Sequence, residues 1–126
     1  MATLSDVQIK QGTTPVITAV VDGQAIQDAT VYLSISTRNR LIVKTNYYES
    51  GDVTLEPVYD ELDEQIGTIV EVQLSQIETL CLKPGLARIE VGWIFEDGSA
   101  DKTNIGVLSI NPTLYRKVMR YGEHSS

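Results

Sequence analysis

Hydrophobic and polar residues alternate with a period of two along much of the chain, the pattern of a β-strand that buries one face. Residues 29–37 (ATVYLSIST), 69–74 (IVEVQL) and 87–95 (ARIEVGWIF) show it most clearly. The large side chain of Trp93 falls in the buried phase of its segment, so we expect it in the core. One buried and one wet face per strand is typical of antiparallel sheets.

Turn signals separate these segments and several shorter apolar runs. Residue pairs that tolerate positive φ are Asp22-Gly23, Ser50-Gly51, Pro84-Gly85 and Asp97-Gly98. They delimit seven or eight short strands at a spacing of roughly ten residues, which favours a sandwich or barrel over alternating helices and strands. Residues 96–104 are expected to form a loop between the last two strands.

One short segment departs from the strand pattern. Ser75 and Glu78 in SQIE have the spacing of a helix capping box. We therefore predict one helical turn that crosses from one sheet to the other, with Ile77 and Leu80 closing the end of the core.

The period changes again after Pro112. Leu114, Tyr115, Val118 and Met119 have the i, i+1, i+4, i+5 spacing of one helix face, and the basic residues Arg116, Lys117 and Arg120 fall elsewhere on that helix. So short a helix is unstable alone and must dock on something. The predicted organisation is thus a β-sandwich domain over residues 1–111 and a C-terminal arm, partly helical, over residues 112–126.

Composition and charge restrict the classes of function. The 126 residues suit one domain, and 42% hydrophobic with 21% charged residues is ordinary globular composition. A net charge of −7 argues against a general nucleic-acid binder. We expect no membrane span and no secretory signal, because no apolar run is long enough and the first residues lack an apolar core.

The charge is unevenly distributed. Residues 49–64 hold seven acidic residues and no basic one, whereas the arm is rich in basic residues. One interpretation is a solvated acidic loop and a loose terminus. The other is that the two opposite charges meet, most simply between neighbouring copies.

Candidate catalytic and metal-binding groups are few. His124, the single histidine, lies near the chain end, and Cys81 lies in an apolar run with no local partner. The acidic residues Asp60, Glu61, Asp63 and Glu64 lack the register and the glycine of a calcium loop. We therefore predict no enzymatic activity, no metal and no cofactor.

Several motifs together resemble the immunoglobulin-like domains of tailed-phage virion proteins, such as the N-terminal domain of the baseplate upper protein. The motifs are VQIKQGTTPVI, VDGQAIQDATVYLSIS, the turn at residues 79–85 (TLCLKPG) and ARIEVGWIFEDGSADKTNIGVLSI. Together they cover most of residues 5–111. The resemblance implies an immunoglobulin-like fold. With the elements predicted above, the expected fold is an all-β, immunoglobulin-like antiparallel β-sandwich of seven or eight strands, with one short helical turn and a C-terminal arm.

The resemblance also implies a function: a bacteriophage virion structural protein, made in the host cytoplasm and assembled into the virion. Because we expect no receptor-binding or coiled-coil extension after the one domain, a capsid decoration protein or a tail, neck or baseplate accessory fits the resemblance. Its expected partners are other virion proteins and further copies of itself, making it a homo-oligomer or a many-copy protein.

We expect the arm to bind a neighbour through its apolar face, in the helix-in-groove mode, with its arginines pairing carboxylates. The predicted partner-binding residues are Leu114, Tyr115, Arg116, Lys117, Val118, Met119, Arg120 and Tyr121, and the candidate acceptor patch is Asp60, Glu61, Asp63 and Glu64. The alternative is a stand-alone β-sandwich binding module for a host surface glycan or protein. Its candidate aromatic patch is Tyr32, Tyr47, Tyr48 and Tyr59, which also suit ordinary strand surface.

Overall fold

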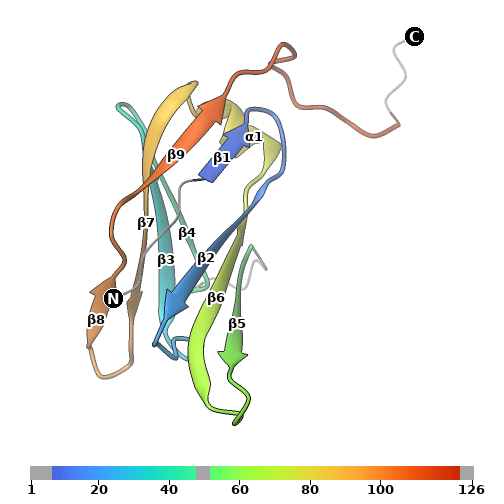
Figure 1. Cartoon of the computed structure of the whole chain (residues 1–126). Helices are drawn as coiled ribbons and strands as arrows, with labels where there is room; N and C mark the ends of the chain where they lie inside the picture. The colour runs from blue at the N-terminus through green and yellow to red at the C-terminus, as the bar shows by residue number, and fades with distance from the viewer. Residues whose placement is uncertain (1–6, 48–51, 123–126) are drawn as a thin grey trace.

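Nine strands and one short helix form a two-layer β-sandwich in the computed structural model, which describes residues 7–47 and 52–122 (Figure 1). The all-β sandwich prediction is confirmed. In chain order the elements are β1 (Val7–Lys10), β2 (Val16–Asp22), β3 (Thr30–Ser36), β4 (Leu41–Thr45), β5 (Val53–Tyr59), β6 (Gln65–Gln73), α1 (Gln76–Cys81), β7 (Gly85–Ile94), β8 (Ala100–Lys102) and β9 (Gly106–Asn111).

The two sheets differ in size. The larger has the order β1-β9-β7-β3-β4, with β8 also paired to β7, and the smaller has the order β2-β6-β5. β1 runs parallel to β9, and every other described pair is antiparallel. The strands of both sheets run along the long axis of the domain. Turns therefore gather at its two ends (Figure 1).

β8 lies within the segment predicted to be a loop. It pairs with the last three residues of β7 and is followed by a break at Thr103, which is only 6% exposed. The Thr103 hydroxyl accepts a hydrogen bond from the Val91 amide at 3.1 Å, and the Thr103 amide donates to the Val91 carbonyl at 2.8 Å. A side chain thus maintains the pairing where the strand is interrupted.

The core lies between the sheets and is filled by the apolar residues that alternate along the strands. Trp93 is 4% exposed and belongs to this core, as predicted. Leu74 and Leu82, on either side of α1, are fully buried and close the core at that end.

The capping box of α1 is confirmed. The Ser75 hydroxyl accepts from the Glu78 amide at 3.1 Å, and Glu78 Oε1 accepts from the Ser75 amide at 2.8 Å. The predicted role of Ile77 is wrong, because its side chain is 62% exposed. Residues two apart on a helix lie about 200° apart, so the buried Thr79 leaves Ile77 on the solvent side. Leu80 is half-buried.

The predicted helix in the arm is wrong for the described residues 112–122, which form neither helix nor strand. A segment of about ten residues keeps a helix only when tertiary packing stabilises it. Here the apolar side chains at the predicted helical spacing are mostly exposed. The arm crosses the end of the sandwich next to α1 and then leads away from it (Figure 1).

Candidate functional site

The arm is fastened to its own domain through its backbone. The Gln76 side chain accepts from the Met119 amide at 2.8 Å and donates to the Met119 carbonyl at 3.0 Å. Nearer the start of the arm, the Thr113 amide donates to Gln11 Oε1 at 3.4 Å. These bonds fix the path of the arm from Thr113 to Met119 across the α1 end of the same copy.

The segment Gln11–Thr13 forms the junction from which the arm departs. Gln11 is 8% exposed, and its side-chain amide donates to the Leu82 carbonyl at 2.7 Å. The Gly12 amide donates to the Thr79 hydroxyl at 3.0 Å. Gly12 has a φ of 76°, which favours glycine, and a Cβ there would lie 3.8 Å from the Thr113 methyl group. The QGT motif of the sequence therefore connects β1, α1 and the arm.

The side chains of the arm are far less engaged than its backbone. Leu114 and Tyr121 are fully exposed, Tyr115 and Met119 are each 56% exposed, and Val118 is half-buried. A cavity of about 220 Å³ beside the arm is lined by Gln11, Leu80, Leu82, Lys83, Pro84 and Arg116, so Arg116 is the only described arm side chain that lines it. The larger apolar side chains of the arm point instead into solvent, where burying them against a partner is favourable.

The predicted acceptor patch lies at the other end of the domain, in the turn of the β5–β6 hairpin (Figure 1). Asp60 Oδ1 accepts from the Leu62 amide at 2.8 Å and from the Glu64 amide at 3.0 Å, so it stabilises the turn. Glu61, Asp63 and Glu64 are exposed. The structure therefore does not bring the arm and this patch together within one copy.

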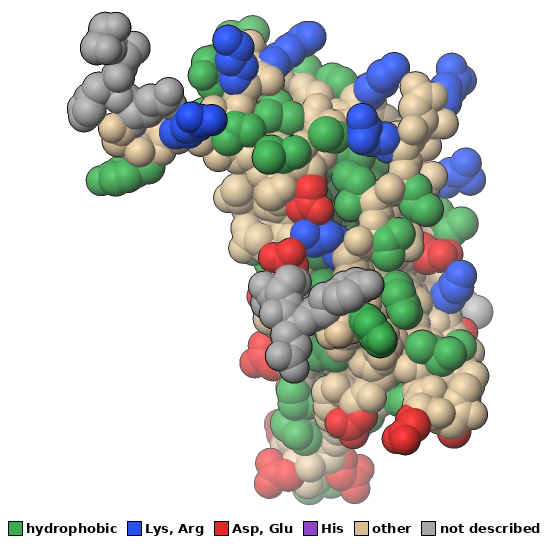
Figure 2. Space-filling view, turned by 180° about the vertical axis from the view of Figure 1, so that it is seen from behind, with side chains coloured by type: hydrophobic (Ala, Val, Ile, Leu, Met, Phe, Trp, Pro, Cys, Tyr) green, Lys and Arg blue, Asp and Glu red, His purple; other side chains and the backbone are tan. Residues whose placement is uncertain are grey.

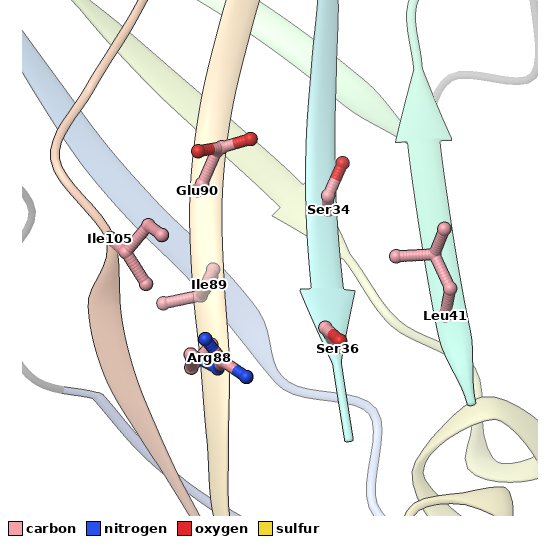
Figure 3. Close-up of a pocket in the computed structure, with 7 residues that line it drawn as sticks. All are labelled: Ser34, Ser36, Leu41, Arg88, Ile89, Glu90 and Ile105. Carbon is pink, nitrogen blue, oxygen red and sulfur yellow. The ribbon is translucent and has the colours of Figure 1, made fainter. Parts of the chain in front are cut away.

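A shallow groove that the sequence pattern did not predict runs along the outer face of the larger sheet. One hollow in it, of about 380 Å³, has Ser34 and Ser36 between Leu41 on one side and Ile105 on the other (Figure 3). Arg88 and Glu90 also line it. The sequence signal is a pair of small outward residues on β3, flanked in space by Leu41 on the next strand, β4, and by Ile105, which precedes β9 and is distant in the chain.

Lys44 forms the centre of a partly buried charged cluster. Its ammonium group lies 2.9 Å from Asp52 Oδ2 and 3.0 Å from Glu78 Oε1, and its side chain is 12% exposed. Burial alone lowers the pKa of Lys44, but the hydrogen bonds and charges of Asp52 and Glu78 raise it above its ordinary value. Burial alone raises the pKa of Glu78, but bonds from Ser75 and Lys44 bring it below its ordinary value. The cluster joins the two sheets and α1, so its role is structural.

The residues considered for catalysis were Cys81 and His124. Cys81 is half-buried as the last residue of α1, and His124 lies outside the described residues. Within the described part of the chain there is no group of three or more His, Cys, Asp or Glu residues suited to a metal ion.

The candidate tyrosines that the structure describes are divided between the two sheets. Tyr32 and Tyr59 are 39% and 55% exposed but belong to different sheets, and Tyr48 lies outside the described residues. Tyr47 is 68% exposed and follows β4.

The chain matches no protein-family model, and no curated protein is recognisably similar to it. In residues 7–47 and 52–122, no helix has the length and apolar character needed to cross a membrane.

Proposed function

We propose that this chain is a structural protein that assembles through its C-terminal arm, and that it serves in the virion of a tailed phage. There it acts as a capsid decoration protein or as a tail, neck or baseplate accessory. One observation carries the assembly role: the arm has its backbone held by Gln76 and Gln11 while its large apolar side chains stay exposed.

An arm whose backbone is held in place while its side chains remain exposed is suited to binding a partner. Binding costs less conformational entropy when the binding segment is already ordered, so more of the gain from burying Tyr115 and Met119 becomes affinity. Arg116 and Arg120 are both exposed and offer planar guanidinium groups for carboxylates on a partner. The arm therefore combines apolar anchors with cations that favour an acidic partner surface.

The immunoglobulin-like part of the proposal is supported by strand order. Matched in chain order to strands B, C, C′, D, E, F and G, the elements β2–β7 and β9 form the G-F-C-C′ and B-E-D sheets of such a sandwich. The virion setting rests on the resemblance of residues 5–111 to tailed-phage domains. A small β-sandwich with an arm also fits a many-copy shell or tail component, which needs protein contacts and no catalysis.

The assembly role is tested by light scattering. The full chain, 13.9 kDa as one copy, is expected to show a larger mass that rises with concentration. The quadruple variant Leu114→Ser, Tyr115→Ser, Met119→Ser and Tyr121→Ser is expected to stay at the mass of one copy with an unchanged melting temperature. If that variant associates as strongly as the natural chain, the arm is not the assembly element.

A matched control changes exposed apolar residues in the middle of two strands, away from the arm: Val20→Thr with Val43→Thr, which are 43% and 45% exposed in the natural chain. This control is expected to associate like the natural chain. The virion setting is tested separately by mass spectrometry of purified particles of the encoding phage. Peptides of the chain are expected in the particles, and their restriction to the soluble fraction of infected cells would contradict that setting.

A further inference from the structure

Charge is segregated along the long axis of the domain. Eight of the ten lysines and arginines lie at the end that carries α1 and the arm, called here the basic end (Figure 2). They are Lys10, Arg38, Arg40, Lys83, Arg88, Arg116, Lys117 and Arg120. Lys44, which lies next to this end, has its positive charge balanced by ion pairs with Asp52 and Glu78.

The opposite end, called here the acidic end, is formed by the β5–β6 and β7–β8 turns and by the segment that joins β2 to β3. Within residues 7–47 and 52–122, its charged residues are nine acids and one base: Asp22, Asp28, Asp60, Glu61, Asp63, Glu64, Glu96, Asp97, Asp101 and Lys102. The nine residues of β6 span most of the distance between the ends, about 30 Å. Each copy is thus strongly dipolar.

The β5–β6 hairpin also presents apolar side chains at the acidic end. Side-chain exposure rises along β5, from 9% at Val53 to 55% at Tyr59, where the pairing with β6 shifts register. Leu62 at the turn is 79% exposed, and Ile66 at the start of β6 is 49% exposed. We name Tyr59, Leu62 and Ile66, with the surrounding Glu61, Asp63 and Glu64, the hairpin tip.

The hairpin tip and the arm are chemical complements. Each has exposed apolar residues ringed by charge, acidic at the hairpin tip and basic at the arm. They lie at opposite ends of the domain, so the arm of one copy does not reach its own hairpin tip. We infer that the arm binds the hairpin tip of a second copy, so that copies associate head to tail. This inference rests on the proposed arm-mediated assembly and names its acceptor.

The groove on the outer face of the larger sheet fits the arm less well. Its charges are already balanced, because Arg88 lies beside Glu90 and Glu90 lies 3.6 Å from the ammonium group of Lys102. It offers no net negative charge to Arg116, Lys117 and Arg120. Complementary charge is what selects and orients a protein partner, and it favours the hairpin tip.

The test exchanges charges between the two surfaces in the full chain. The hairpin variant is Glu61→Lys with Glu64→Lys, which leaves Asp60 to hold the turn. The arm variant is Arg116→Glu with Arg120→Glu. Each variant alone is expected to associate roughly 100-fold more weakly than the natural chain, because like charges then face each other. An equimolar mixture is expected to regain association, since both kinds of junction between the two variants pair opposite charges.

The mixture also controls for folding, because a misfolded variant does not restore binding. A matched variant, Asp28→Lys with Glu96→Lys, reverses two charges at the acidic end outside the hairpin tip and is expected to retain affinity within about threefold. Association of the natural chain is expected to weaken as salt rises.

Three results would overturn the inference, and they differ in whether arm-mediated assembly also fails. If the arm variant fails to associate but the hairpin variant associates normally, the acceptor lies elsewhere and arm-mediated assembly stands. If neither reversal nor the arm serine variant changes association, the arm role fails as well. If the natural chain remains monomeric up to about 1 mM, copies do not bind one another and the arm serves a different protein.

Discussion

The ammonium group of Lys44 donates hydrogen bonds to both carboxylate oxygens of Glu78, at 3.0 and 3.1 Å. The bond connects β4, the edge strand of the larger sheet, to the first turn of α1. Because Lys44 also binds Asp52, directly before β5, one side chain joins both sheets next to the end from which the arm emerges.

Glu78→Gln is expected to lower the free energy of unfolding by about 1–2 kcal/mol at neutral pH. Glutamine still serves a capping box, so the loss isolates the charged contact with Lys44. The folded-state pKa of Glu78 is below its ordinary value of 4.5. Its stabilisation is therefore present above that value and is lost as pH falls through the folded pKa.

Urea unfolding from pH 7 down to pH 3 measures this effect. The difference between the natural chain and Glu78→Gln is expected to shrink as the solution becomes more acidic. The exposed Glu56→Gln serves as the control and is expected to match the natural chain. A difference that stays constant with pH would show that the Glu78 charge contributes no pH-dependent stability.

Gln76→Ala is expected to release the arm without unfolding the domain. It removes both hydrogen bonds to Met119, so exchange of the Met119 amide hydrogen should accelerate to the rate of an unstructured peptide. The free energy of unfolding should change by less than about 0.5 kcal/mol. Gln76→Glu keeps an acceptor for this amide and should retain part of its protection, measured by hydrogen exchange with mass spectrometry. Unchanged exchange in Gln76→Ala would mean that the bonds do not hold the arm.

Asp60→Ala is expected to cost about 1–2 kcal/mol of unfolding free energy, because Oδ1 accepts two backbone hydrogen bonds within the turn. Glu61→Ala, one residue later and exposed, is expected to be neutral for stability. Thermal melting of the two variants distinguishes the role of Asp60 in the turn from the proposed binding role of its neighbour. Equal melting temperatures of the two variants would contradict the role of Asp60 in stabilising the turn.

Addition of EDTA is expected to leave the melting temperature unchanged. A metal bound to the folded state stabilises it by mass action, so its removal lowers the melting temperature. The acidic residues of the β5–β6 turn are the most concentrated candidates for calcium, and the carboxylate of Asp60 is engaged with backbone amides instead. A clear drop in melting temperature with EDTA, reversed by added calcium, would show that the folded protein binds a metal ion.

The strands and the capping box could be predicted because each is encoded locally. Alternation identifies a strand wherever one face is buried, as in β3 and β7. The same rule fails for β8, whose three residues are all exposed and are held by pairing with β7. The helix predicted for the arm had the right spacing, but spacing produces a helix only where something buries its apolar face.

The candidate site could be predicted only in part. Local composition identified the apolar, basic arm and the acidic turn. Their placement at opposite ends depends on the strand order, which joins segments distant in the chain. The Lys44 cluster was missed for the same reason, since Glu78 lies 34 residues from Lys44. Likewise, Tyr59 and Leu62 become parts of a surface only where β5 extends beyond the cover of the larger sheet.

The separation of the arm and the hairpin tip gives any row of copies a direction. The proposed contact joins two different surfaces, the arm of one copy and the hairpin tip of the next. A row of copies that does not close into a ring therefore ends in an unoccupied arm on one side and an unoccupied hairpin tip on the other. An open row could be halted at either terminus by a different protein. A partner with an acidic apolar knob would stop one terminus, and a partner with a basic apolar tail would stop the other.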